Sequence, residues 1–346
     1  MVVHNPNNWH WVDKNCFSWA REYFSEKVVK LNTGEVEGKY AEISSLSSLE
    51  GDCEVNQRKG KVISLFDLNM VMLIKGYVND QQFEGSITVP EVAFDSGKDD
   101  YQFDISIYKE TSQLNEIKPL IREKLLPQLR EIFQKFSHDL LVTHGSDIQL
   151  PEDSVNSTFT KANQQDSFAS SAGPKESKSL PKNQAPKAGT ATGSPEKPIV
   201  STSGGNTTSI HLEPTFNVPA SELYRTFIDK QRIMAWSKSF ACPKAGSEPT
   251  LNVGDEFELF GGNVTSRLTH AEKDKQLVFT WRLSDWRDKV ESKLIMEFHE
   301  SKEYHETKLQ VNWTGIPLGE EDRVRGNFEE YYVRSIKITF GFGAVL

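Results

Sequence analysis

Apolar and polar residues alternate with a period of two through the first third of this chain. The alternation is clearest at five positions, Phe66, Leu68, Met70, Met72 and Ile74, and it returns between Tyr101 and Ile107. Successive side chains of a strand point to opposite faces, so each run predicts a strand with one buried face. Turn residues interrupt residues 39–108 at short intervals, as Gly51-Asp52, Asn79-Asp80 and Ser96-Gly97. Connections this short cannot hold a helical crossover, so the pattern predicts an antiparallel meander.

Helices are predicted on both sides of this meander. Apolar residues spaced by three and four predict a helix from about residue 9 to residue 30, with a stripe of Trp9, Val12, Cys16, Trp19 and Tyr23. The same spacing predicts a helix over about residues 116–143, with a stripe of Ile121, Leu125, Leu129, Ile132, Phe136 and Leu140. Pro127 lies inside that second helix and should kink or split it. Helix, meander and helix give an elongated α+β domain over residues 1–150.

The last third of the chain repeats the strand pattern and ends in a helix. Alternating apolar positions separated by short turns predict five strands within residues 256–313, after a strand near Ile210 and a helix that opens at Pro219. A long final helix is expected from about Glu320, with a stripe of Val324, Phe328, Tyr331 or Tyr332, Ile336 and Phe340. The prediction for residues 209–346 is therefore a curved antiparallel sheet that grips a long C-terminal helix.

Residues 151–208 separate these two domains and consist mainly of Ser, Thr, Pro, Gly, Ala, Asn and Lys. Large apolar side chains are few in this segment, chiefly Phe159, Phe168 and Leu180. Such a segment cannot bury enough apolar surface to offset the entropy of ordering it, about 1–2 kcal/mol for the backbone of each residue. We expect a flexible linker; the alternative is a long ordered loop.

Composition narrows the class of protein. The 346 residues carry a net charge of −9, whereas proteins that coat nucleic acid are typically basic, so no nucleic-acid partner is expected. No apolar run approaches the roughly 20 residues that span a bilayer, so no membrane partner is expected either. Cys16, Cys53 and Cys242 are odd in number and show no CxxC spacing, which indicates reduced thiols and a cytoplasmic protein.

No catalytic pattern is found in the sequence, so neither an enzyme activity nor a cofactor is predicted. The phosphate-loop, GxSxG and HExxH patterns are all missing. The densest group of metal-ligand residue types is His299, Glu300, Glu303, His305 and Glu306. This group falls around a predicted hairpin turn, where neighbouring strand positions point to opposite faces, so we expect a solvated hairpin tip and no metal.

Two short motifs of the first domain are candidates for binding. The first is an amide-rich N-terminal segment followed by aromatic residues: Asn5, Asn7, Asn8, Trp9, His10 and Trp11. It is explained most simply as a helix cap followed by core aromatics. The second is Arg58-Lys59-Gly60-Lys61 at the entry to the long strand. It is either a solubilising strand end or a docking patch for an acidic or polar protein surface, with Gly60 allowing close backbone approach.

The second domain leaves other functions open. A helix-grip domain of the START or Bet v-like type can enclose a cavity, so the chain could carry a lipid or another small apolar ligand. A filled core is the competing interpretation, because aromatic stripes at this spacing usually pack together. A third hypothesis is an ATP-independent holdase that shields unfolded chains with its N-terminal aromatic residues.

Together these residues resemble the Aha-type activators of the heat shock protein 90 ATPase, and the overall character resembles a fungal member. Asn5-Pro6-Asn7-Asn8-Trp9-His10-Trp11 is similar to the N-terminal signature of that family, and Arg58-Lys59-Gly60-Lys61 is similar to its basic docking motif. Residues 213–346 resemble its C-terminal domain, most clearly at 216–219, 260–263, 313–317 and 340–346. Only the linker is left unmatched.

The resemblance implies a co-chaperone of protein folding and the stress response that acts without being an enzyme. The first domain would dock on the middle segment of the chaperone through Arg58, Lys59 and Lys61. The segment from Asn5 to Trp11 would supply an additional stimulating contact. The second domain would engage the ATP-binding domains of the chaperone dimer and favour their closure. The protein itself is expected to be a monomer.

Overall fold

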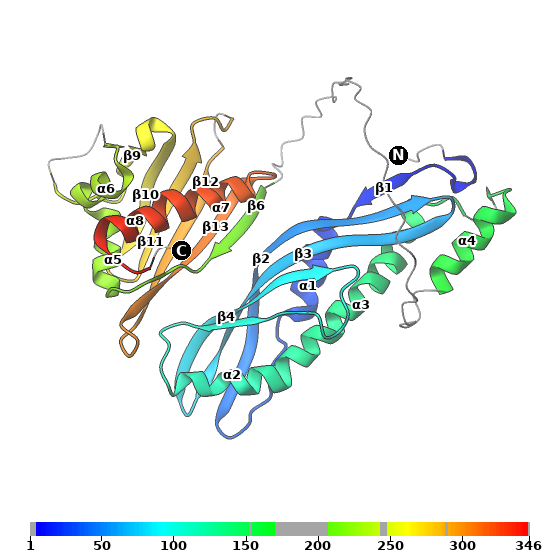
Figure 1. Ribbon diagram of the computed structural model, residues 1–346, viewed down its shortest axis with the longest axis horizontal. Helices are drawn as coiled ribbons and strands as arrows, with labels where there is room; N and C mark the ends of the chain where they lie inside the picture. The colour runs from blue at the N-terminus through cyan, green and yellow to red at the C-terminus, as the bar shows by residue number, and fades with distance from the viewer. Residues whose placement is uncertain (1–4, 152–153, 170–206, 243–247, 288–289, 345–346) are drawn as a thin grey trace.

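The computed structural model describes residues 5–151, 154–169, 207–242, 248–287 and 290–344, which form two domains (Figure 1). Each domain is built on one antiparallel sheet with helices packed against it, so the predicted α+β class is confirmed. The first domain is elongated, because two of its strands run along most of its length.

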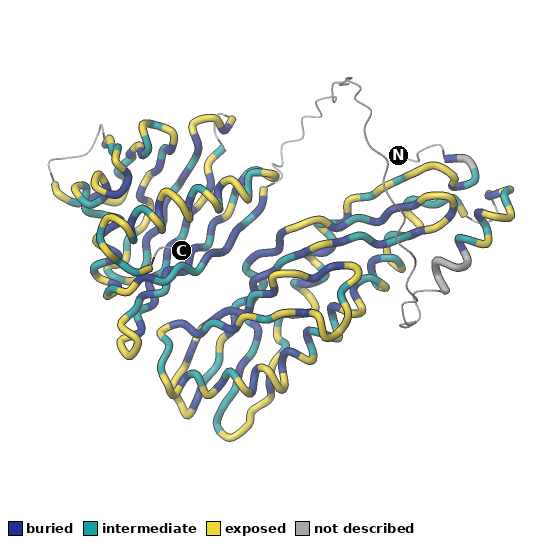
Figure 2. The backbone as a smooth tube through the Cα atoms, in the orientation of Figure 1, coloured by how far each residue is buried: buried dark blue, intermediate teal, exposed yellow. Residues whose placement is uncertain are grey.

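The first domain contains the predicted meander. Its five strands pair in chain order, β1-β2-β3-β4-β5, and every pair is antiparallel. The strands are β1 (Val12–Asn15), β2 (Lys39–Arg58), β3 (Lys61–Val78), β4 (Gln81–Ala93) and β5 (Asp104–Ile107). Buried positions alternate with more exposed ones most regularly along β3 (Figure 2), and the predicted stripe from Phe66 to Ile74 is buried.

One predicted turn is wrong. Gly51-Asp52 lies inside β2, which pairs continuously with β3 past this point, with Gly51 opposite Leu68. Gly51 has a φ of 110°, and a Cβ at this position would lie 2.0 Å from the carbonyl oxygen of Asp67. Glycine is therefore needed for the close approach of the two strands rather than for a chain reversal.

The first predicted helix starts later than expected. Residues 9–16 are not helical: Val12–Asn15 form β1, which pairs with the end of β2, Val12 opposite Gln57. Helix α1 covers only Phe17–Val28, and it buries Ala20, Phe24 and Val28. The spacing of the aromatic residues suggested a helix, but the pairing with β2 determines the structure before residue 17.

The long helix after the meander is split into three helical segments, one of the two effects expected of Pro127. It consists of α2 (Ile117–Leu120), a π-helical stretch (Ile121–Leu125) and α3 (Leu126–His144). Pro127 lies in the first turn of α3 and has no N–H to donate, so the regular hydrogen-bond ladder changes just before it. Phe136 of α3 packs on Phe24 of α1, with 4.6 Å between ring centroids. Burying each such ring contributes about 1.5–3 kcal/mol.

The segment expected to be a flexible linker begins with a helix. Helix α4 (Thr158–Ala169) lies against the tip of the β2–β3 hairpin (Figure 1). The remainder of the expected linker up to residue 206 lies outside the described residues.

The second domain has the predicted curved sheet. Its strand order is β6-β13-β12-β11-β10-β9-β8, and β7 (Thr215–Phe216) pairs with β13. The strands are β6 (Thr207–Leu212), β8 (Phe240–Ala241), β9 (Glu256–Leu259), β10 (Val264–Glu272), β11 (Gln276–Leu283), β12 (Ser292–Ser301) and β13 (Glu306–Pro317). Two shorter helices, α5 (Ala220–Ile228) and α6 (Lys230–Ser237), contribute to the same core.

The final helix lies on this sheet, as expected (Figure 1). It comprises α7 (Glu321–Asn327), a π-helical stretch (Phe328–Arg334) and α8 (Ser335–Phe340). Of the two alternatives in its predicted stripe, Tyr332 is the buried residue, and its hydroxyl accepts a hydrogen bond from the indole N–H of Trp281 at 2.9 Å. Tyr331 is exposed.

Candidate functional site

The basic motif forms the turn of the longest hairpin. Arg58 ends β2 and pairs with Lys61 at the start of β3, so Lys59 and Gly60 are the two turn residues. Both have positive φ, 52° and 81°, as expected for the two-residue turns that match the twist of a hairpin. Arg58, Lys59 and Lys61 are all exposed. The motif was expected at a strand entry; its position at the tip presents three cations to solvent.

The N-terminal segment folds against this turn. The backbone N–H of Gly60 donates to the carbonyl oxygen of Asn8 at 2.8 Å, and that of Lys59 donates to the carbonyl of Trp9 at 3.2 Å. The side-chain amide of Gln57 also donates to the Asn8 carbonyl. The two motifs, about 50 residues apart in sequence, therefore form one site.

Asn5 and Asn8 hold the segment in place. Asn5 is buried; its amide donates to Oε1 of Gln57 at 2.8 Å, and its Oδ1 accepts the N–H of His10 at 2.9 Å. Asn8 is fully buried and bonds both backbone groups of Leu150 through its amide and its Oδ1, at 3.1 and 2.9 Å. These asparagines do not cap a helix at Trp9, as the simplest interpretation expected, and their burial leaves them no direct contact with a partner.

The aromatic residues of the segment are presented to solvent. Trp9 is 45% exposed and Trp11 is 54% exposed, and His10 is also exposed, so the expectation of core aromatics is wrong. The ammonium of Lys59 lies 5.3 Å from the centre of the Trp9 ring, within the range of a cation–π contact. Exposed tryptophan beside a cation is typical of protein interaction surfaces.

A second candidate surface is the contact between the two domains. The guanidinium of Arg325 in α7 donates to both carboxylate oxygens of Glu50 in β2, at 2.6 and 2.8 Å. Burial raises the pKa of the Glu50 carboxyl, and Arg325 only partly opposes that effect. The raised pKa indicates that the attraction of Arg325 does not fully offset the free-energy cost of removing the Glu50 carboxylate from water, which is common for buried ion pairs.

A polar network continues this contact. Glu213 accepts from the hydroxyl of Tyr108 at 2.6 Å and lies 2.7 Å from Nε2 of His211. Burial alone would raise the pKa of Glu213, but the hydrogen bonds from His211 and Tyr108 lower it to about 2. Nδ1 of His211 is 2.9 Å from the hydroxyl of Ser47 in the first domain. No sequence motif marks this network, because Tyr108 and Ser47 belong to the first domain, whereas His211 and Glu213 belong to the second.

His299 also lies at the domain contact rather than at a solvated hairpin tip. Its ring stacks on Tyr108 with 4.5 Å between centroids, and its Nε2 lies 2.9 Å from Oε1 of Gln310. The turn after it is exposed, as predicted, and Glu303 there accepts the backbone N–H of Ser112 at 2.9 Å. Among the described residues, no group of three or more His, Cys, Asp and Glu side chains is placed to hold a metal ion.

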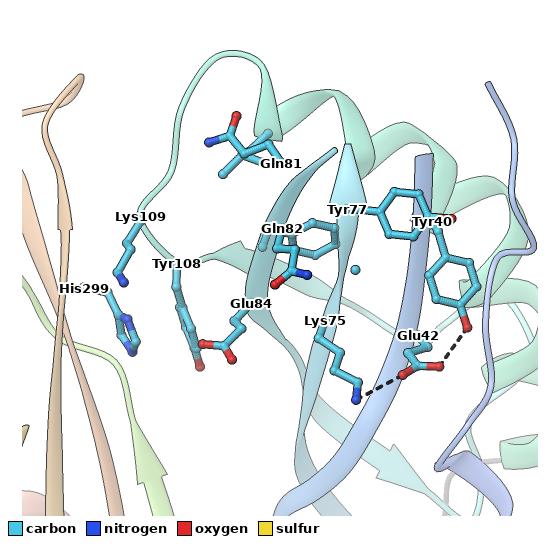
Figure 3. A pocket seen from close by; sticks show the side chains of 13 residues that line it. Tyr40, Glu42, Lys75, Tyr77, Gln81, Gln82, Glu84, Tyr108, Lys109 and His299 are labelled. Atoms are coloured by element: carbon cyan, nitrogen blue, oxygen red, sulfur yellow. Dashed lines mark hydrogen bonds and ion pairs between the residues drawn. The ribbon is translucent and has the colours of Figure 1, made fainter. Parts of the chain in front are cut away.

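Open grooves flank the domain contact, with volumes of about 550 and 580 Å³. Figure 3 shows the first groove, with His299 facing Tyr108 and Lys109 at one end and Tyr40 and Glu42 at the other. Glu42 is engaged by the hydroxyl of Tyr40 at 2.7 Å and by Lys75 at 3.3 Å. The contact between the domains is therefore polar and bordered by open grooves, unlike either domain core.

The helix-grip domain has a filled core. The enclosed space among its apolar side chains has a volume of about 20 Å³. Its lining includes Trp236, Phe257, Phe279, Trp281 and Tyr332. That volume is near the minimum that holds one water molecule, far below the hundreds of Å³ of a ligand pocket. The carrier hypothesis therefore has no cavity to support it in the described part of the domain.

Two family models match most of the chain. Residues 13–144 match the model described as the N-terminal domain of the activator of Hsp90 ATPase, and residues 217–341 match the activator of Hsp90 ATPase homolog 1-like protein. Together they cover the first domain from β1 to α3 and the second domain from its first helix to its last.

Similar proteins of known name agree with these models. The chain is 61% identical to the Hsp90 co-chaperone AHA1 of Saccharomyces cerevisiae, and the match covers 100% of both chains. It is 26% identical to the activator of 90 kDa heat shock protein ATPase homolog 1 of Homo sapiens, covering 99% of this chain and 94% of that protein. It is 35% identical to the Hsp90 co-chaperone HCH1 of Saccharomyces cerevisiae, covering 43% of this chain and 100% of that protein. This chain therefore belongs to the family of activators of the heat shock protein 90 ATPase.

Proposed function

We propose that this protein is a co-chaperone that binds the heat shock protein 90 dimer and stimulates its ATPase. The observation that carries the proposal is the single surface formed by the basic turn and the N-terminal segment, with Lys59 placed over Trp9. Support also comes from the relatives, which are named as co-chaperones or activators of that ATPase.

The N-terminal domain would dock on the middle segment of the chaperone. Arg58, Lys59 and Lys61 present three positive charges at an exposed hairpin tip, which suits an acidic protein surface. Trp9, His10 and Trp11 add exposed aromatic area beside them. Asn5 and Asn8 would act indirectly, by holding these aromatic residues against the turn, and Asn7 would act by bonding the backbone of residues 156 and 157.

The second domain would engage the ATP-binding domains of the chaperone dimer. A protein that binds the closed form of a slow ATPase more tightly than the open form raises the population of the closed form. Each 1.4 kcal/mol of such preference changes that population about tenfold. This mechanism needs no catalysis by the co-chaperone, and a monomer with one copy of each domain suffices.

The proposal includes the division into residues 1–150, 151–208 and 209–346, with the start of the middle segment folded as α4. It also places the protein in the cytoplasm. Cys16 and Cys53 are free, buried thiols, which fits a reducing compartment. No helix among the described residues is both long enough and apolar enough to cross a membrane.

The proposal is tested by measuring ATP turnover of purified heat shock protein 90 with increasing amounts of this protein. We expect turnover to rise and then saturate as the chaperone is filled. Turnover that stays at its basal rate, while both proteins remain folded and soluble, would reject the proposed function.

A further inference from the structure

Helix α4 is fastened to the backbone of the basic turn. The side-chain amide of Asn163 donates to the carbonyl oxygen of Lys59 at 2.8 Å. A Cβ on Gly60 would lie 2.4 Å from the carbonyl oxygen of Thr160, and Thr160 is fully buried. Gly60 was expected to allow close approach of a backbone; the approaching backbone is that of α4.

The residues that lead into α4 are fixed to both motifs as well. Oδ1 of Asn7 accepts the backbone N–H of Asn156 at 2.7 Å. The side-chain amide of Gln149 donates to the carbonyl of Gly60 at 2.7 Å, and Val155 is buried. This network connects α4 to the N-terminal segment and to the turn at once, so α4 is a part of the first domain (Figure 1).

Helix α4 packs beside the basic turn without covering its charged side chains. Arg58, Lys59 and Lys61 stay exposed with α4 in place, and Trp9 keeps 45% of its surface. The helix also presents an aromatic side chain of its own. Phe159 is 57% exposed, and its ring centre lies 6.4 Å from that of Trp9.

We propose that α4 is part of the docking surface, with Phe159 as a contact residue and Asn163 as a positioning residue for Lys59. The inference rests on the proposed function and extends the docking surface to a segment outside the two sequence motifs. The partner surface that fits is an acidic patch of the chaperone with an apolar side chain between its carboxylates. The cations pair with the acidic groups, and Trp9 and Phe159 cover the apolar side chain.

Binding of the full-length variant Phe159→Ala to heat shock protein 90 tests the contact. Calorimetry should show affinity about tenfold weaker than that of the unchanged protein, because aromatic residues are enriched among the few contact residues that contribute most of the binding energy. Phe94→Ala is the matched control, because Phe94 is 52% exposed after β4, away from the hairpin tip. Equal affinity of Phe159→Ala and the unchanged protein would overturn the inference.

Hydrogen exchange of the α4 backbone gives a second measurement that needs no substitution. If α4 is part of the docking surface, the amides of residues 158–164 should exchange more slowly when the chaperone is bound. Unchanged or faster exchange would mean that α4 lies outside the contact or is displaced, and either result overturns the inference. Lys59→Glu separates the two proposals, because a failure of that variant to weaken binding contradicts the proposed function itself.

Discussion

The ammonium of Lys59 lies 5.3 Å from the centre of the Trp9 ring. Lys59 belongs to the basic turn and Trp9 to the N-terminal segment, so this contact joins the two motifs into one surface. The backbone N–H of Lys59 also donates a hydrogen bond to the carbonyl of Trp9, so the main chains of these two residues are joined as well. Changes to either motif should therefore affect the other.

Asn5→Ala should destabilise the first domain and reduce ATPase stimulation together. The buried amide of Asn5 makes hydrogen bonds to Gln57 and to His10, and removing it leaves these partners unsatisfied. The expected loss is about 1–3 kcal/mol in the free energy of unfolding, measured by denaturant titration. Asn252→Ala, at an exposed loop position, should change the stability far less. Equal stability of Asn5→Ala and the unchanged protein would show that these bonds do not hold the segment.

Trp11→Ala should separate stability from function. Trp11 is 54% exposed, so its removal should change the free energy of unfolding by no more than about 0.5 kcal/mol. Stimulation of chaperone ATP turnover should nevertheless fall, because the exposed ring is available to the partner. A variant that stimulates as well as the unchanged protein would remove Trp11 from the proposed surface.

Arg325→Ala should open the domain contact without unfolding either domain. Without the guanidinium, the carboxylate of Glu50 is left buried and unpaired, and separation of the domains returns it to water. Small-angle X-ray scattering should show a larger radius of gyration, while the thermal transitions of the two domains stay in place. Arg334→Ala, on the exposed side of the final helix, is the control. An unchanged radius would show that the pair does not hold the domains together.

The domain contact should also loosen as the pH falls below about 6.5. Burial holds the pKa of His299 below 6.5, so the contact favours the neutral ring, and protonation at lower pH favours separation. The groups that face His299 are Tyr108, Gln310, Glu297, Glu84 and Lys109.

Two carboxyls change this dependence at lower pH. Burial in the contact raises the pKa of Glu50 above 4.5. Protonation of Glu50 as the pH falls therefore favours the contact, which is opposite to the effect of His299. Glu213 has a pKa of about 2, so its contribution is lost between pH 4.5 and 2. Scattering against pH should show expansion beginning below 6.5, and His299→Phe, which keeps a stacking ring, should remove that first step. Expansion of His299→Phe over the same range would assign the effect to another group.

Local patterns predicted the secondary structure well wherever burial alternates regularly. The strands around Phe66 and the stripe of the final helix are examples, because the spacing of apolar residues there matches the spacing of buried positions. The pattern failed at Trp9, whose spacing suggested a helix although the segment is fixed by bonds to Asn8 and the hairpin turn. It failed again at α4, whose buried Thr160 and exposed Phe159 give no apolar stripe.

The sequence predicted the two motifs of the candidate site but not that they lie in contact. The basic motif and the amide-rich segment were visible as motifs, but their union depends on β1 pairing with the far end of β2. The contacts of Glu50 with Arg325 and of Tyr108 with Glu213 join residues more than 100 positions apart, and no local composition marks them. Phe159 was the one signal for α4, as a large apolar residue in a polar run.

The most direct test of the central claim is ATP turnover of heat shock protein 90 with Lys59→Glu, compared with Lys135→Glu. Both variants make the same charge change, but Lys135 is exposed on α3, outside the proposed docking surface. The proposed function predicts that Lys135→Glu stimulates as the unchanged protein does and that Lys59→Glu, still folded by circular dichroism, loses most of its stimulation. Full stimulation by Lys59→Glu would contradict the claim that the hairpin tip docks on the chaperone.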